Sequence, residues 1–220
     1  MSSLGCVMSL KKMRIKLSKK VVRDLKEVSR LSSVKKWEYA GNVKYKKYDF
    51  EDLEYVTSRR VNRVLSKEIK KVWNEPITFH THPGITEPGE SIDDDMEIFT
   101  TLPSNADFYA YIRGSPLMQV NIICDSHGYY VIDIHESVYK SKLPLPEAVY
   151  TEMSNLRKTP GLKSKVFNED GVEYFCTSLK NWKRLINGEV NPYMSYLFGI
   201  NIRYYTYNDE PPIVTVFQED

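Results

Sequence analysis

Two histidines separated by one residue restrict the architecture of this chain more than any other feature. The sequence has four histidines among 220 residues, and two of them fall in the segment His80-Thr81-His82-Pro83. The residues from Ile77 to His80 favour a short strand. Side chains two apart on an extended segment share a face, so the fold must direct both imidazoles toward the same space. That arrangement suits a metal ion.

The spacing of apolar residues predicts alternating strands and helices around this segment. Met13, Ile15 and Leu17 alternate with basic residues, which predicts a strand with one buried face. Ser18 is a suitable N-cap for an amphipathic helix that extends to about Leu31. Further expected elements are strands at 37–48 and 50–57, helices at 59–73 and 91–100, and strands at 107–112, 118–124 and 129–134. Together these elements indicate an α/β protein of mixed α+β type.

The last 85 residues carry no comparable chemical pattern. Residues 143–146 are expected to form a linker, 147–158 and 179–186 helices, and 200–207 and 213–217 strands. We therefore predict a chemically active core at 13–135 and a C-terminal extension at 136–220 that packs on it. The role of that extension stays open.

Composition narrows the cellular setting and the partners. The chain has three cysteines, Cys6, Cys124 and Cys176. Their odd number and the absence of a CxxC spacing argue against a secreted disulfide framework. The chain lacks a long apolar run and an N-terminal signal core, so we expect an intracellular protein, cytoplasmic or nuclear, with no membrane partner. A net charge of +2 predicts no nucleic-acid partner. The basic run Lys11–Lys20 lacks interleaved aromatics and is expected to face solvent.

A hydrolytic zinc site usually takes three protein ligands from histidine and carboxylate and leaves a fourth position for water. The acidic segment from Ser91 to Asp95 provides candidate carboxylates after the loop that follows Pro83. Ser91 is expected to cap the helix at 91–100, and Asp94 shares a face with it at a spacing of three. His80, His82 and one of these aspartates are the candidate ligands.

The same residues resemble the JAMM or MPN-type (JAB) zinc metalloproteases, a family that includes deubiquitinases. The family pattern is a Glu beside a small-residue strand, then HxHP, a loop and SxxD. Here it reads Glu38-Tyr39-Ala40-Gly41, then His80-Thr81-His82-Pro83, then Ser91-Ile92-Asp93-Asp94, and the resemblance covers about residues 13–135. The family's usual loop of about ten residues selects Asp93. The SxxD spacing selects Asp94, and a later helix start selects Asp95.

The resemblance implies a cytidine-deaminase-like fold with a central mixed β-sheet flanked by helices. It also implies that His80, His82 and Asp94 bind Zn²⁺, that Glu38 acts as general base and then general acid, and that Ser91 donates to the oxyanion. The expected reaction is hydrolysis of an amide bond at the C-terminal tail of ubiquitin or a ubiquitin-like protein.

Other interpretations remain open from the sequence alone. The chain could be a non-catalytic MPN scaffold in a larger assembly, or it could cleave a sulfur-carrier tail or a small cysteine conjugate. Glu38 could be a solvent-facing strand residue, and Ser91 could be only a helix cap. His127 and His135 are expected to have structural roles. Residues 83–90 and the segment after Thr100 are candidate walls of a groove for an extended substrate.

Overall fold

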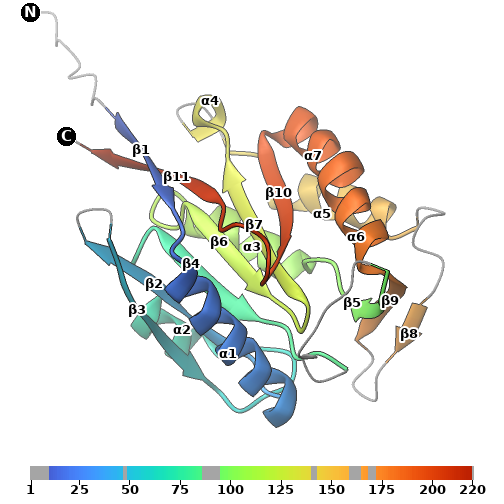
Figure 1. Ribbon diagram of the computed structural model, residues 1–220. Coiled ribbons are helices and arrows are strands. Elements are labelled where there is room, and N and C mark those ends of the chain that lie inside the picture. The colour runs from blue at the N-terminus through green and yellow to red at the C-terminus, as the bar shows by residue number, and fades with distance from the viewer. Residues whose placement is uncertain are drawn as a thin grey trace, which may run out of the picture.

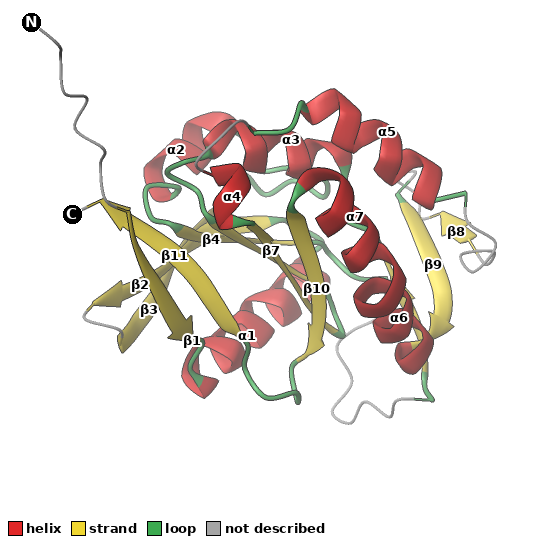
Figure 2. Cartoon of the chain, turned by 90° about the horizontal axis from the view of Figure 1, so that it is seen from above, coloured by secondary structure: helices red, strands yellow, loops and turns green. Residues whose placement is uncertain are grey.

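The structure is a computed structural model that describes residues 10–46, 49–85, 95–139, 143–158, 165–167 and 172–219. It is a mixed α/β protein with a central mixed sheet flanked by helices, as the sequence predicts. Helix α1 covers one face of the sheet, and α2, α3 and α5 cover the other (Figure 2).

The central sheet has six strands in the order β10-β7-β6-β4-β2-β3. Strands β4 and β6 run parallel, and the other neighbours are antiparallel. Strand β4 therefore lies inside the sheet, between β6 and β2. The bounds are β2 Tyr39–Lys46, β3 Asp49–Thr57, β4 Ile77–Thr81, β6 Val120–Cys124, β7 Gly128–Ile134 and β10 Ile200–Thr206.

Two smaller sheets join parts of the chain that are far apart in sequence. Strand β1 (Leu10–Lys16) pairs with β11 (Ile213–Glu219), so the first and last described strands lie side by side (Figure 1). The third sheet has the order β5-β9-β8. Its strands are β5 Glu97–Thr100, β9 Glu173–Ser178 and β8 Lys165–Phe167.

Serine side chains cap the N-termini of some of the helices. Ser18 caps α1 by accepting the Val21 N–H, and Ser104 caps α3 by accepting the Asp107 N–H. The bounds are α1 Lys19–Lys35, α2 Ser66–Val72, α3 Asn105–Gly114, α4 Glu136–Tyr139, α5 Pro146–Leu156, α6 Leu179–Leu185 and α7 Asn191–Phe198, with a π-helical turn at Ile186–Val190 between α6 and α7.

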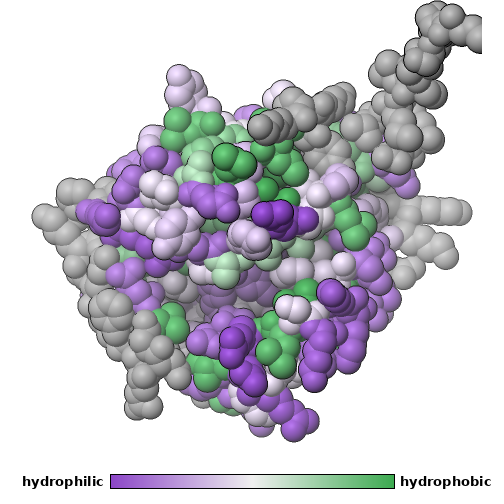
Figure 3. Space-filling model, turned by 180° about the vertical axis from the view of Figure 1, so that it is seen from behind, coloured by the Kyte–Doolittle hydropathy of each residue, from purple (hydrophilic) through white to green (hydrophobic). Residues whose placement is uncertain are grey.

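The hydrophobic core lies on both faces of the central sheet. Along β7, Tyr129 and Val131 enter the cluster beneath α1, whereas Tyr130 and Ile132 enter the cluster on the opposite face. This alternation follows the two-residue period of a strand. On the face seen from behind, exposed hydrophobic residues are intermixed with hydrophilic ones (Figure 3).

Gly41 lets two strands approach closely beside the start of β2. A Cβ atom at this position would lie 2.0 Å from the Glu54 carbonyl oxygen and 2.8 Å from the Phe79 ring. No larger residue fits there without a backbone shift.

Most predicted strands agree with the structure, but the segment between β4 and β6 differs. The predicted helix at 91–100 is wrong at its end, because Glu97–Thr100 forms β5 and pairs with β9; residues 91–94 lie outside the described residues. The predicted strand at 107–112 is also wrong, because these residues belong to α3. Phe108, Tyr111 and Ile112 are buried at helical spacing.

Before β4, the helix predicted at 59–73 is shorter in the structure, because α2 begins only at Ser66.

Strands from the predicted core (13–135) and strands from the predicted C-terminal extension (136–220) pair within the same sheets. From the segment 136–220, β10 pairs with β7 and β11 pairs with β1. The boundary at residue 135 stays a prediction. Among the described residues, no helix combines the length and apolar character that crossing a membrane requires.

Candidate metal centre

Strand β4 delivers two imidazoles to one point. His80 pairs with Ala40 of β2 on one side and with Ile123 of β6 on the other. His82 follows the strand, and its N–H donates to the Cys124 carbonyl at 2.8 Å. The backbone is therefore held beside both ligand candidates, and their Nε2 atoms lie 3.3 Å apart.

Helix α3 supplies a carboxylate to the same point. Asp107 Oδ1 lies 3.0 Å from His80 Nε2, and Oδ2 lies 3.3 Å from His82 Nε2. Asp107 also closes a capping box, because Oδ2 accepts the Ser104 N–H at 2.6 Å while Ser104 Oγ accepts the Asp107 N–H at 3.2 Å. The first turn of α3 thus fixes the direction of this carboxylate.

The three side chains form a group that could hold a metal ion. Ligand atoms about 2.0–2.2 Å from a tetrahedral zinc ion are about 3.3–3.6 Å from one another. The two Nε2 atoms are 3.3 Å apart, and each lies within 3.0–3.3 Å of one of the two Asp107 carboxylate oxygens. Two histidines and one carboxylate are also a donor set found in hydrolytic metal sites. The residues present therefore fit such an ion.

Glu38 lies beside this group, directly before β2. Burial raises the pKa of its carboxyl group to about 7, against the opposing effect of His82 and His80 and with a smaller contribution from the charge of Asp107. Its N–H donates to the Arg60 carbonyl at 2.9 Å, and its carbonyl accepts the Thr57 hydroxyl at 2.7 Å. Glu38 is thus a carboxyl group near neutral pKa on a fixed backbone, which suits proton transfer.

The carboxylate and the imidazoles of the group stabilise each other's charged forms. Burial alone would raise the pKa of Asp107, but the two imidazoles hold it well below its usual value. Burial alone would lower the pKa of His82, but Asp107 and Glu38 raise it. Asp107 is therefore ionised at neutral pH, the form in which a carboxylate binds a cation.

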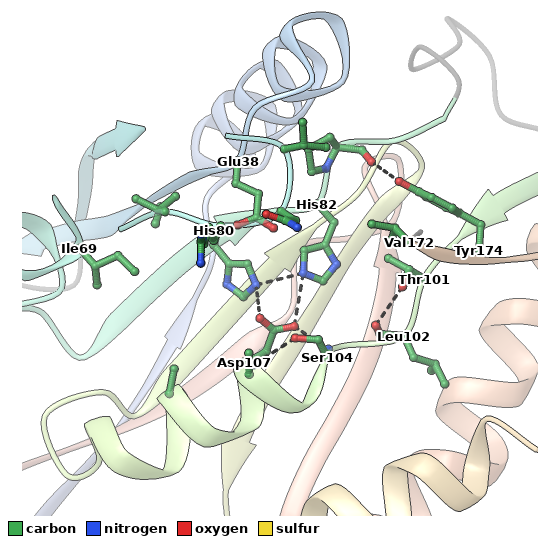
Figure 4. A pocket seen from close by; sticks show the side chains of 18 of the residues that line it. Glu38, Ile69, His80, His82, Thr101, Leu102, Ser104, Asp107, Val172 and Tyr174 are labelled. Carbon is green, nitrogen blue, oxygen red and sulfur yellow. Dashed lines mark hydrogen bonds and ion pairs between the residues drawn. The ribbon is translucent and has the colours of Figure 1, made fainter. Parts of the chain in front are cut away.

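A cavity of about 280 Å³ opens over the group. Ile69 of α2 lines one side, and Leu102, Val172 and Tyr174 line another (Figure 4). Trp73, directly after α2, also lines the cavity. The Tyr174 hydroxyl donates to the Pro83 carbonyl at 2.7 Å, which ties β9 to the chain just after His82. In Figure 4, Glu38 and Asp107 approach the imidazoles from opposite sides. The walls are mainly apolar, so they shield the polar groups from water.

The structure brings together three of the five predicted site residues: Glu38, His80 and His82. Ser91 and Asp94 lie outside the described residues, as does Asp93, so their predicted roles stay predictions. Asp95 is described and exposed, and it is not part of the group. Of the other histidines, His127 is buried elsewhere, and His135 Nε2 lies 3.0 Å from Asn201 Oδ1.

Sequence reasoning missed Asp107, although a signal for it was present. The segment Ser104-Asn105-Ala106-Asp107 also has the SxxD spacing. A Ser followed three residues later by an acidic residue is moreover a helix-start pattern. The acidic segment 91–95 is closer to His82 in sequence, and the pattern at 107–112 favours a strand. Both patterns favour other residues over Asp107 as the third ligand.

Comparisons with protein-family models, with curated proteins and with solved structures found no match.

Proposed function

We propose that this protein is a zinc-dependent metalloprotease of the JAMM/MPN type with a cytidine-deaminase-like fold. Its expected substrate is an amide bond at the C-terminal tail of ubiquitin or a ubiquitin-like protein. The observation that carries the proposal is the convergence of His80, His82 and Asp107 beside Glu38 in one cavity. With Ser104 and Asp107 as SxxD, the order Glu, HxHP, SxxD is retained in the chain.

His80, His82 and Asp107 would hold the zinc ion. When bound, the ion would supply Lewis acidity toward a carbonyl oxygen and would lower the pKa of water. Glu38 accepts a proton from the attacking water and then donates it to the leaving amine as the C–N bond breaks. Burial raises the pKa of the Glu38 carboxyl group, which makes it a stronger proton acceptor. No side chain forms a covalent bond with the substrate in this scheme.

Ser104 is the candidate donor to the oxyanion in this proposal. Its Oγ lines the cavity and accepts the Asp107 N–H at 3.2 Å. That bond uses a lone pair of the oxygen, so the hydroxyl proton remains a donor for the substrate. A donor fixed at a helix start needs little reorganisation when negative charge develops on the carbonyl oxygen.

An intracellular setting, cytoplasmic or nuclear, is part of the proposal. Cys124 and Cys176 are free thiols, which agrees with a reducing compartment. The partner would be the conjugate itself, and a protein complex could present it.

Metal analysis combined with a cleavage panel tests the function. The purified protein should contain about one zinc per chain and should cleave ubiquitin or ubiquitin-like conjugates. Glu38→Gln should keep the zinc and lose turnover. Zinc far below one per chain, even after zinc addition, would overturn the proposal. Unchanged cellular function of Glu38→Gln would instead favour the scaffold interpretation.

A further inference from the structure

Thr81 occupies a special place in the site because it stands between the two histidines. Neighbouring side chains on a strand point to opposite faces, so Thr81 points away from the cavity while His80 and His82 face it. On that opposite face its hydroxyl donates to Ser32 Oγ of α1 at 2.8 Å. Thr81 and Ser32 are both fully buried. A polar link therefore passes through the core directly behind the candidate ligands.

The two ends of this hydrogen-bonded link are backbone groups of Trp37 and Tyr39, the residues on either side of Glu38. The Tyr39 N–H donates to Thr81 Oγ1 at 3.0 Å. At the other end, the Ser32 hydroxyl donates to the Trp37 carbonyl at 2.7 Å. The donors run in one direction, from the Tyr39 N–H through the hydroxyls of Thr81 and Ser32 to the Trp37 carbonyl. Each hydroxyl donates once and accepts once, so no proton in the chain is left unused.

The residue enclosed by these two contacts is Glu38. Its own N–H and carbonyl are bound by Arg60 and Thr57. The peptide groups before and after it are therefore tied to the residue that separates His80 from His82. Regular pairing of β2 with β4 ends at Ala40 and His80, so beyond that point the Thr81 hydroxyl takes the place of a backbone acceptor.

We propose that Thr81, acting with Ser32, is a positioning residue that sets the distance of Glu38 from the metal centre. The proposal rests on the proposed function, in which Glu38 transfers the proton. Small displacements of a reacting group are costly, since an error of about 1 Å can lower a rate on the order of 10²-fold. Buried hydrogen bonds are also expensive to leave unmade.

Thr81→Val tests the role, because valine keeps the shape of threonine and lacks the hydroxyl. Thr81→Ser restores the hydroxyl. Thr78→Val is the matched control: Thr78 lies on the same strand and is equally buried, but its hydroxyl donates to the Val120 carbonyl at 3.3 Å. All three variants and the wild type are compared as zinc-loaded full chains.

We expect Thr81→Val to bind zinc with wild-type stoichiometry and to lower kcat about 10- to 100-fold with little change in KM. Thr81→Ser should recover most of that loss, and Thr78→Val should leave kcat within about threefold of the wild type. A second readout is independent of turnover. Amide hydrogen exchange at Tyr39, followed by NMR, should accelerate about tenfold or more in Thr81→Val and remain slow in Thr81→Ser.

The outcomes separate the two proposals. An active wild type whose kcat is unchanged by Thr81→Val overturns the positioning role and leaves the proposed function intact. A zinc-loaded wild type that cleaves no conjugate counts against the function, and Tyr39 exchange then decides the positioning alone: slow exchange in Thr81→Val overturns it. If Thr81→Val does not fold, Ser32→Ala interrupts the same link from the helix side while the Tyr39 N–H keeps its Thr81 acceptor. Its kcat is judged by the same criterion, so an unchanged kcat overturns the positioning role.

Discussion

The two halves of the candidate metal centre are held by different kinds of contact. Glu38, His80 and His82, here called the sheet half, are fixed by strand pairing and by the hydroxyl link through Thr81. Ser104 and Asp107, the helix half, are fixed by the first turn of α3. The sheet half depends on many backbone bonds, whereas the helix half depends on one cap. Single substitutions should therefore act most sharply on the helix half.

The largest expected effect is at Asp107. Asp107→Ala removes one of the three candidate ligands, so zinc binding should fall below one per chain and turnover should drop on the order of 10³-fold or more. Inductively coupled plasma mass spectrometry and a cleavage assay measure both quantities. Asp94→Ala is the matched control, because Asp94 is the ligand that the sequence favoured. Full zinc in Asp107→Ala and loss of zinc in Asp94→Ala would reverse the assignment.

The second expected effect is at Ser104. Ser104→Ala removes the proposed oxyanion donor and should lower kcat about 10²- to 10³-fold. It also removes the α3 cap and should reduce the free energy of unfolding by about 1 kcal/mol. Ser104→Thr keeps a hydroxyl and should retain most activity, and Ser91→Ala should have little effect. A kcat for Ser104→Ala within threefold of the wild type would assign the residue to capping alone.

The comparison of the two halves also explains what the sequence could predict. Ile77–Thr81 follows a local pattern, so the strand was predicted correctly, and His80 and His82 both belong to the group that could hold a metal ion. Strand β5 pairs with β9, which comes more than seventy residues later, and no local pattern announces such a partner. For α3 the local signal existed: Phe108, Tyr111 and Ile112 have helical spacing. Because Phe, Tyr and Ile also have high β propensity, the same residues led to the prediction of a strand instead of a helix.

The candidate site follows the same division. Glu38 was predicted from the family pattern, in which a Glu precedes a small-residue strand, and burial in the structure raises its carboxyl pKa to about 7. That value depends on burial by distant parts of the chain, so no sequence window contains it. Val172 and Tyr174 complete the cavity wall from the C-terminal region, and this contribution has no counterpart in the sequence pattern. Local spacing thus locates the two histidines, whereas the wall residues depend on contacts between distant parts of the chain.

The third expected effect tests the close packing beneath the sheet half. Gly41→Ala would place a Cβ atom 2.0 Å from the Glu54 carbonyl oxygen, so β2 and β3 must separate. The free energy of unfolding should fall by about 1–3 kcal/mol, measured by urea denaturation. Gly188→Ala is the matched control, because nothing lies within 4 Å of its new Cβ. It should be neutral or stabilising by less than about 1 kcal/mol. Equal stability for the two variants would contradict the close approach.

The smallest expected effect concerns the tie between the C-terminal region and the sheet half. Tyr174→Phe keeps the ring in the cavity wall and removes the hydroxyl that donates to the Pro83 carbonyl. Because Tyr174 is buried, that carbonyl loses a partner where water has little access, and the free energy of unfolding should fall by about 1 kcal/mol. The backbone of His82 keeps its bond to Cys124, so zinc content and kcat should change less than threefold.

Tyr196→Phe is the control for this substitution, since Tyr196 is 88% exposed and should lose no measurable stability. The two variants are compared by urea denaturation and by zinc analysis. A large loss of zinc in Tyr174→Phe would mean that β9 helps to hold His82 in place, and the sheet half would then depend on the C-terminal region as well. A small loss of stability with zinc retained would show that strand pairing and the Thr81 link suffice to hold both histidines.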